Sequence, residues 1–168
     1  MFIAHLPSGY IFAKAVIAKI NLDSISQRSL ITVMCIGALF PDLDLFYFFL
    51  IDQQSVHHHR YFLHWPSFWL LLFLAAFAWA AISRYRSKAA VLASLFCAAA
   101  ILHLFLDTLV GDIWWFAPLL DQPYALFEVT ARYKPWWLNF IFHWSFAVEV
   151  LICGYAYWIY RKSAQLKS

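Results

Sequence analysis

The sequence predicts an all-α, polytopic transmembrane bundle of about four to five helices, together with an interfacial loop or a re-entrant helix. Of its 168 residues, 64% are hydrophobic and only 12% are charged, whereas a soluble domain carries about 25% charged residues. Several apolar runs approach the roughly 20 residues that a helix needs to cross a hydrocarbon core. Because the chain is too short for several domains, we expect one membrane-embedded domain over residues 1–168.

Three apolar runs meet the length of a spanning helix clearly, namely residues 67–83, 89–110 and 136–160. A fourth run, 30–51, is long enough but is interrupted by Pro41, so we expect it to kink or unwind there, facing protein or a wet cavity. The N-terminal stretch 8–20 predicts a weaker helix that either spans the membrane or lies in its interface.

Basic residues predict the orientation of these helices, because loops rich in Lys and Arg face the cytoplasm. Three groups fit one side: Lys19 with Arg28, then Arg84 with Arg86 and Lys88, then Arg161 with Lys162 and Lys167. The loop 52–66 and the segment 111–135 then fall on the extracytoplasmic side. The latter is rich in Trp, Pro and Tyr, which favours an interfacial loop or short re-entrant helix. Its own Arg132 and Lys134 count mildly against this orientation.

The net charge is only +3, and no stretch is basic enough to predict a nucleic-acid partner. The informative polar residues instead gather beside or within the apolar runs, near the predicted extracytoplasmic side. Ionisable groups are costly at membrane depth and persist mainly where they pair, bind an ion or do chemistry. This distribution suggests a membrane-embedded metal site.

His103 and Asp107 form the first candidate motif. They are four residues apart, so they share one helix face, where an imidazole and a carboxylate can hold a divalent ion. A buried hydrogen bond between the two, tying helices together, explains this pair alone equally well.

Asp42 and Asp44 form the second motif, directly after Pro41. Proline can open a helix whose first turn favours carboxylates, so a helix-start signal is one interpretation. Both acids lie between apolar runs, where a start signal alone would be expensive. We therefore favour metal ligands or residues that orient ligands.

The stretch from His57 to His64 is the densest cluster of imidazoles, which are the commonest protein ligands for zinc and related ions. Not all of them can point inward. We expect His59 and His64 to be ligands in preference to His57, and we leave His58 open as a supporting residue. Arg60 cannot bind a metal, but its guanidinium matches the oxygens of a phosphate or carboxylate.

Other candidates are weaker when taken singly. His5 is uninformative alone, although Gly9 close behind it allows a close backbone approach. Asn139 and His143 share a face of the last helix and could hydrogen-bond to metal ligands or simply between helices. For Glu149, which is off that face, an interhelical hydrogen bond is the simpler interpretation.

Together these motifs resemble the YdjM-like family, described as LexA-binding, inner-membrane-associated metal-dependent hydrolases. Four stretches carry the resemblance, and Gly111, Trp114 and Pro118 continue it; the stretches are residues 5–9, residues 37–44, His59-Arg60 with His64, and residues 103–108. Tyr61, Leu63 and Trp65 stand where the family usually has Gly, Thr and Ser, so small and hydroxyl-bearing neighbours of the histidines are lost. The resemblance implies a bacterial inner-membrane location and a class of reaction, without a substrate.

The resulting hypothesis is a metal-dependent hydrolase at the outer leaflet. One or two divalent ions, with zinc favoured by the histidine content, would be held by His5, Asp42, Asp44, His59, His64, His103 and Asp107. A metal-activated water would attack the substrate, with Asp44 as general base and Arg60 holding an anionic group. Membrane lipid is the expected partner and a lipid phosphoester the expected substrate, with an amide or ester left open. The residues identify no protein partner.

Three alternatives belong to other classes of protein. A metal-binding scaffold would lack an open coordination position, and a metal transporter would place acids and histidines along a path between both membrane faces. The predicted cytoplasmic half is apolar, which argues against transport. A bundle with purely structural His–Asp pairs would bind no metal.

Overall fold

The computed structural model describes residues 3–20, 22 and 24–165, and these residues form an all-helical fold. The helices are α1 (His5–Lys19), α2 (Gln27–Leu39), α3 (Asp44–Leu50), α4 (Pro66–Ile82), α5 (Lys88–Asp107), α6 (Leu138–Ile141) and α7 (Trp144–Gln165). Three 3-10 turns complete the described elements: η1 (Phe40–Leu43), η2 (His58–Arg60) and η3 (Phe62–His64). Strand-type pairing in the described residues is limited to one isolated bridge between Ile113 and Tyr124. The all-α prediction is confirmed for this part of the chain, whereas Lys167 lies outside it.

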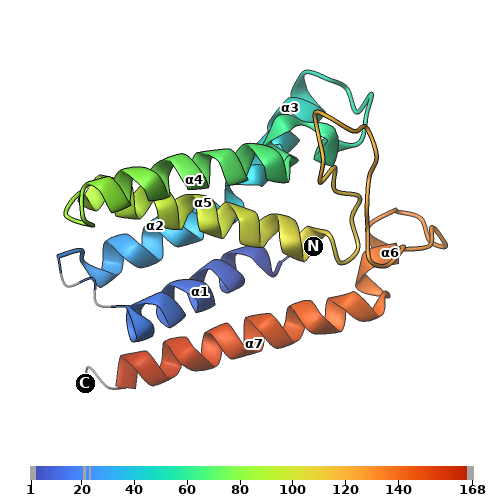
Figure 1. Ribbon diagram of the computed structural model, residues 1–168. Helices are drawn as coiled ribbons and strands as arrows, with labels where there is room; N and C mark the ends of the chain where they lie inside the picture. The colour runs from blue at the N-terminus through green and yellow to red at the C-terminus, as the bar shows by residue number, and fades with distance from the viewer. Residues whose placement is uncertain (1–2, 21, 23, 166–168) are drawn as a thin grey trace.

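The long helices lie side by side (Figure 1). Helix α2 packs against both α1 and α5, α5 packs against α4, and α7 packs mainly against α1. Helix α3, helix α6 and the segment 108–137 gather at the end where α1 begins and α5 ends, while the α4–α5 connection lies at the opposite end. The ends of helices distant in sequence therefore meet at one end of the molecule.

Local sequence signals explain where these helices begin and how closely they pack. The Ser26 hydroxyl accepts a hydrogen bond from the backbone N–H of Ser29 at the start of α2, and Ser87 does the same at the start of α5, as capping residues do. Pro66 stands in the first turn of α4, where its missing N–H costs nothing. Gly9 allows α1 to approach α2, because a Cβ there would lie 2.7 Å from the Ala38 Cβ.

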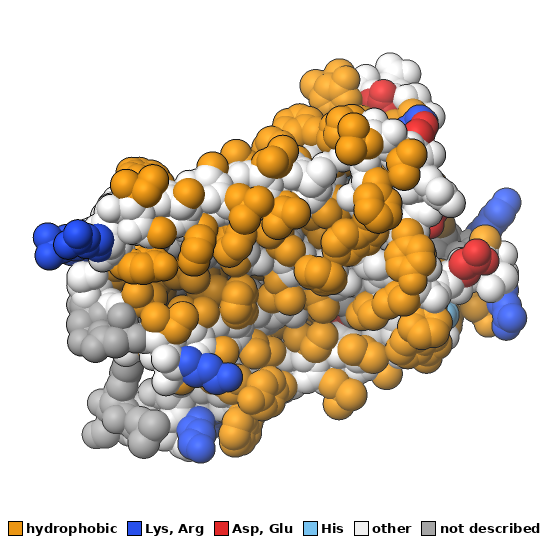
Figure 2. All heavy atoms as spheres, in the orientation of Figure 1, with side chains coloured by type: hydrophobic (Ala, Val, Ile, Leu, Met, Phe, Trp, Pro, Cys, Tyr) orange, Lys and Arg blue, Asp and Glu red, His pale blue; other side chains and the backbone are white. Residues whose placement is uncertain are grey.

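Within the described residues, two helical stretches are long and apolar enough to cross a membrane. They are Gln27–Leu50, with a mean hydropathy of 1.7, and Lys88–Asp107, with a mean hydropathy of 2.4; α4 is a shorter apolar helix. These stretches correspond to the spans predicted at 30–51 and 89–110. Hydrophobic side chains cover much of the surface of the long helices (Figure 2).

The predicted interruption at Pro41 is confirmed, because α2 passes into the 3-10 turn η1 before α3 begins. The single helix predicted over 136–160 is wrong at its start: α6 ends at Ile141 and α7 begins at Trp144. His143 gives the physical reason, since its Nδ1 accepts the backbone N–H of Ser145 (3.4 Å) and pairs with the Ser145 hydroxyl (2.9 Å) at the start of α7. Such local bonds compete with helix formation.

The segment between α5 and α6 contains no helix in residues 108–137, so the re-entrant helix is wrong and the loop alternative is confirmed. Backbone hydrogen bonds fold this loop back on itself, from Leu126 N–H to the Thr108 carbonyl (2.8 Å) and from Phe127 N–H to the Leu109 carbonyl (3.0 Å). The loop is thereby held against the C-terminal end of α5, where the polar motifs meet.

Candidate metal centre

Six of the predicted ligands come together at this end of the molecule, from four parts of the chain. All but Asp42 are buried, and Asp42 is 31% exposed. They are His5 at the start of α1, Asp42 in η1, His59 in η2, His64 in η3, and His103 with Asp107 at the end of α5. Because this fold brings α1, η1 and the end of α5 together, residues up to 102 positions apart share one site.

Asp107 lies at the centre of the cluster, with four imidazoles around its carboxylate. Its oxygens lie 2.9 Å from His103 Nε2, 3.1 Å from His5 Nε2, 3.6 Å from His64 Nε2 and 3.7 Å from His59 Nε2. A structural His–Asp hydrogen bond needs one imidazole, so four on one buried carboxylate exceed what helix pairing requires. The arrangement therefore favours the ligand interpretation over the structural one.

The spacing of the donor atoms fits a shared ion. Nε2 of His64 and Nε2 of His103 are 3.3 Å apart, and Asp42 Oδ1 lies 3.9 Å and 3.7 Å from them. Around tetrahedral zinc, bonds of about 2.0–2.1 Å place neighbouring donors roughly 3.3 Å apart. The nitrogen and oxygen separations of 2.9–3.9 Å in this cluster need only small adjustments to reach that geometry.

The outer nitrogens of the rings are fixed in a way that directs Nε2 inward. His103 Nδ1 donates to the Ala38 carbonyl (2.8 Å) and His59 Nδ1 donates to the Asp112 carbonyl (3.0 Å). With the proton on Nδ1, the neutral ring carries its lone pair on Nε2, and metal-binding histidines are oriented by such bonds almost always. The rings are thus set for ligation before any ion binds.

Gly111 explains how His59 can reach the cluster. A Cβ at this position would lie 2.7 Å from the His59 Cε1 atom, a separation that requires either the ring or the loop to move. The loop backbone can therefore pass beside the imidazole only because residue 111 has no side chain.

The potential ligand atoms fall into two groups that share no residue. In His5, Asp42, His103 and Asp107 they all lie within 4.8 Å of one another, and the same holds for His58, His59 and His64. The Nε2 atom of His5 is buried and lies 3.1 Å from Asp107 Oδ1, so it faces the same point as the other inward nitrogens. The residues present therefore fit one ion, and their number leaves room for a second.

The loop histidines differ in their protonation. Burial lowers the pKa of His58 to about 4 and lowers the pKa of His59 well below its usual range. Burial also opposes protonation of His64, but the hydrogen bonds and charges of Asp107 and Asp44 outweigh it and raise its pKa to about 9. His58 and His59 are therefore neutral at pH 7, whereas an ion bound to His64 must displace a proton.

Asp44, predicted as ligand and general base, lies on the far side of His64 from Asp107. Its Oδ2 accepts a hydrogen bond from His64 Nδ1 at 2.5 Å, while His64 Nε2 faces Asp107. Asp42 and Asp44 thus approach opposite nitrogens of one ring. This geometry is that of a carboxylate that orients a metal-binding histidine.

Arg60, predicted as an anion-binding residue, forms an ion pair with Asp121 at 2.5 Å, and both side chains are about half exposed or more. His57 and His58 lie at the edge of the cluster: His57 Nδ1 accepts the backbone N–H of His59, and the His58 ring stands 4.0 Å from the His59 ring. His59 thus lies nearer to Asp107 than His57 does among the described contacts, and Arg60 has a partner outside the cluster.

Asn139 and His143 hydrogen-bond elsewhere. Asn139 bonds to the backbone of the preceding loop, and His143 Nδ1 pairs with the Ser145 hydroxyl at 2.9 Å. Among the described contacts, neither reaches a cluster histidine or carboxylate. That Asn139 and His143 hydrogen-bond to metal ligands remains a prediction, and no described contact supports it.

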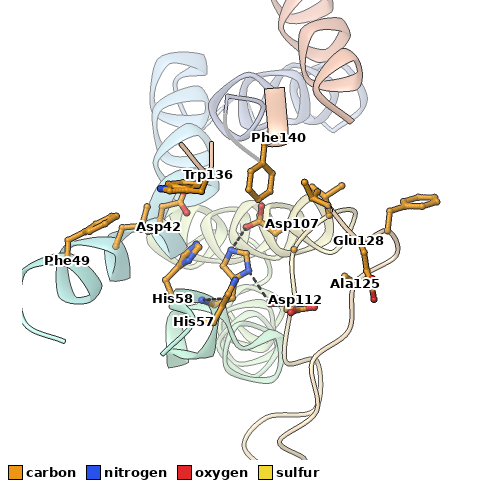
Figure 3. A pocket seen from close by; sticks show the side chains of 16 residues that line it. Asp42, Phe49, His57, His58, Asp107, Asp112, Ala125, Glu128, Trp136 and Phe140 are labelled. Atoms are coloured by element: carbon orange, nitrogen blue, oxygen red, sulfur yellow. Dashed lines mark hydrogen bonds and ion pairs between the residues drawn. The ribbon is translucent and has the colours of Figure 1, made fainter. Parts of the chain in front are cut away.

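A cavity of about 600 Å³ opens beside the cluster. Its lining combines polar side chains, such as Asp42, His58 and Asp107, with the aromatic side chains of Trp136 and Phe140, and the Phe140 ring points toward Asp107 (Figure 3). The lining residues are Asp42, Leu45, Phe49, His57, His58, His59, Asp107, Val110, Gly111, Asp112, Ala125, Phe127, Glu128, Val129, Trp136 and Phe140. The cavity thus joins the metal-type donors to an apolar, aromatic wall, and its lining in the described structure includes no Lys or Arg.

Sequence reasoning missed several contributors to this site. The carbonyls of Ala38 and Asp112 carry no signal in the sequence, because every residue has a carbonyl. For Glu149, the predicted hydrogen bond to another helix is present, since its Oε2 accepts the backbone N–H groups of Ile3 and Ala4 at the start of α1. Those backbone partners carry no signal in the sequence either.

Fold and cluster together define a class: an all-helical protein with membrane-type apolar helices and a buried histidine–carboxylate cluster. Residues 1–166 match the family model described as YdjM inner membrane protein. The chain therefore belongs to the YdjM family of inner membrane proteins, which confirms the resemblance seen in its motifs. Searches of curated proteins and of solved structures found no match.

Proposed function

We propose that this protein is a membrane-embedded, metal-dependent hydrolase that cleaves a lipid phosphoester. The observation that carries the proposal is the donor geometry: His64 Nε2, His103 Nε2 and Asp107 Oδ2 lie 2.9–3.6 Å apart, beside a cavity with an apolar wall. Zinc suits this nitrogen-rich donor set. One or two ions would be held by His5, Asp42, His59, His64, His103 and Asp107.

A divalent ion at this site would lower the pKa of a bound water toward about 7. Asp42 is the cluster carboxylate that is partly exposed and lines the cavity, so it is placed to take the proton from the attacking water. As the bond between phosphorus and the leaving oxygen breaks, the same carboxyl returns that proton to the leaving alcohol. Asp44, which the sequence suggested as the base, instead holds His64.

The cavity supports an amphiphilic substrate. Its polar side would receive the headgroup, while Phe49, Phe127, Trp136 and Phe140 would pack against the first carbons of the acyl chains. Because the described lining has no Lys or Arg, the phosphoester charge would have to be balanced by the ion. This makes catalysis strictly dependent on the metal.

We further propose a multi-pass arrangement, with α1, α4 and α7 accompanying the two clearly apolar stretches through the membrane. Lys and Arg side chains appear at the end where α4 meets α5, and a belt of hydrophobic side chains covers the middle of the same face (Figure 2). With the basic end in the cytoplasm, the cluster would face the extracytoplasmic leaflet. Cysteine accessibility at positions 60 and 86 tests this, since labelling of both from the same side would overturn it.

The metal content of detergent-purified protein tests the function most directly. Wild type would be compared with Asp107→Ala, His64→Ala and the control His143→Ala, in which the lost imidazole lies outside the cluster. We expect zinc in the wild type and the control and most of it lost in the other two. Equal metal in all four proteins, or none in any, would overturn the proposal.

Activity then separates an enzyme from a metal-binding scaffold. The metal-loaded wild type would be offered a panel of phospholipids, with Asp107→Ala as the blank. We expect release of phosphate or a phosphorylated headgroup by the wild type alone. A fully metal-loaded protein that cleaves none of the panel's phosphoesters would favour the scaffold.

A further inference from the structure

Glu149 on α7 is a buried carboxylate outside the metal centre. It is 2% exposed, and its Oε2 accepts hydrogen bonds from the backbone N–H groups of Ile3 (2.6 Å) and Ala4 (3.2 Å). These two residues immediately precede His5, the first residue of α1. A carboxylate from near the C-terminus of the chain is therefore bound to the N-terminus of the helix that begins with a cluster histidine.

Helix α1 lacks a cap of its own. Ala4 at the N-cap position has no side-chain hydrogen bond, and the first turn of α1 has no acidic residue. The free N–H groups and the positive end of a helix dipole favour an anion at this position. Glu149 supplies that anion from another helix.

A second contact from α7 reaches Ile3. Cys153 is one turn after Glu149 on α7, so both share a face, and its Sγ lies 3.7 Å from the Ile3 carbonyl. Helix α7 buries few other residues, namely Ser145 and Ala156. The contacts of Glu149 and Cys153 with Ile3 and Ala4 thus form a main polar link between α7 and the rest of the described structure.

The position of His5 depends on this turn. Its ring stands 3.7 Å from the His103 ring, with Nε2 at 3.1 Å from Asp107 and Nδ1 at 3.3 Å from Asp42. Gly9 fixes the following turn of α1 against Ala38, but it does not fix the residues before His5. We propose that Glu149 is a positioning residue, which caps the first turn of α1 and so holds His5 at the metal centre.

Amide exchange tests the cap without any metal. In chelator-treated protein, mass spectrometry would follow exchange in the N-terminal peptide of wild type, Glu149→Leu, Glu149→Gln and the control Val150→Leu, an exposed neighbour. Hydrogen bonds to charged groups are strong enough that their loss in Glu149→Leu should speed exchange about tenfold or more. Glu149→Gln keeps an acceptor oxygen and should stay protected. Slow exchange in Glu149→Leu, or fast exchange in Glu149→Gln, would overturn the cap.

Zinc affinity tests the link to His5, and this part rests on the proposed metal centre. Glu149→Leu should weaken zinc binding about 10–100-fold, as loss of a ligand's supporting residue does. In a His5→Ala background the same change should cost less than about twofold, because its effect runs through His5. Equal losses in both backgrounds would overturn the positioning role. A wild type that binds no zinc would remove the proposed function, while the exchange experiment would still decide the cap.

Discussion

The two halves of the molecule bury opposite kinds of side chain, although the same helices build both. At one end α1 and α5 bury His5, His103 and Asp107, each in contact with another ionisable group. Toward the other end the same two helices, with α2 and α4, bury apolar side chains of the described core together with the Ser94 hydroxyl, which bonds to the Ala90 carbonyl. These include Ala13, Val16, Leu30, Met34, Ala80, Ala90 and Val91.

This difference shows what the fold tolerates. A buried charge without a partner costs several kcal/mol, so ionisable groups can be buried only where several of them converge. The described core offers such a place at one end, and buried acids and histidines do not continue into the apolar half. A transport path between both faces would need them there, which favours an enzyme or scaffold over a transporter.

The largest effect is expected when a carboxylate is placed in the apolar half, which tests whether that half tolerates a buried charge. Met34 is fully buried among Ala13, Val16 and Ala38, none of which can pair with a charge. We expect Met34→Asp to lower stability by about 3–5 kcal/mol, as an uncompensated buried charge does, and Met34→Leu by less than about 1.5 kcal/mol. Thermal unfolding in detergent measures both, and a Met34→Asp melting temperature close to that of wild type would contradict the contrast.

Zinc should stabilise the folded protein through the candidate ligands at the polar end, and the apolar half should play no part in this effect. A ligand at a hundred times its dissociation constant stabilises the folded state by about 2.7 kcal/mol, so zinc should raise the melting temperature of wild type. His103→Ala should abolish most of this shift. Leu30→Ala should lower the melting temperature, by a cavity cost of about 2–5 kcal/mol, yet retain the shift. An undiminished shift in His103→Ala would show that the ion binds elsewhere.

The sequence predicted which residues converge but not how each one works. Imidazoles and carboxylates inside apolar runs are rare enough to reveal the cluster, and the topology inferred from Lys and Arg put His5, His64 and Asp107 on one side. Their division into ligands and supporting residues could not be predicted, because it depends on which ring nitrogen faces which oxygen. Asp42 and Asp44 were both predicted as metal ligands or residues that orient ligands, and the structure puts them on opposite nitrogens of His64.

Long-range backbone contacts were beyond the sequence as well. Glu149 accepts hydrogen bonds from backbone N–H groups 146 and 145 residues away. Because every residue except proline has a backbone N–H, no sequence motif identifies these two as its partners. The break between α6 and α7 was missed for a related reason. A mean over the apolar run 136–160 hides the local hydrogen bonds of His143 with Ser145, which stand where α7 begins anew.

A subtler test separates ligand from supporting residue at the polar end. Asp44→Asn removes the charge that holds His64 Nδ1 but leaves every candidate ligand on the inner side of the ring in place. We expect zinc affinity to fall about 10–100-fold, as for other residues that orient metal ligands, with bound zinc still attainable at higher concentration. Asp52→Asn, which alters a carboxylate bonded to Tyr61 and Ser55, should leave affinity unchanged. Titration with a zinc indicator measures this, and a loss in both variants or in neither would contradict the role of Asp44.

The smallest effect is expected at Arg60, where the sequence and the structure point in different directions. Its position beside His59 predicted an anion clamp, but the guanidinium pairs with Asp121 and is 48% exposed, and it does not line the described cavity. Exposed ion pairs contribute only about 0–1 kcal/mol, so Arg60→Ala should change the melting temperature and zinc affinity little. Hydrolysis of the lipid panel should also stay within about twofold of wild type, a difference below 0.5 kcal/mol. The opposite result would be a fall in kcat/KM of tenfold or more in Arg60→Ala with zinc retained, while Asp121→Ala leaves kcat/KM unchanged. The guanidinium would then have to leave Asp121 to contact the substrate, and Arg60 and the ion would share the phosphoester charge.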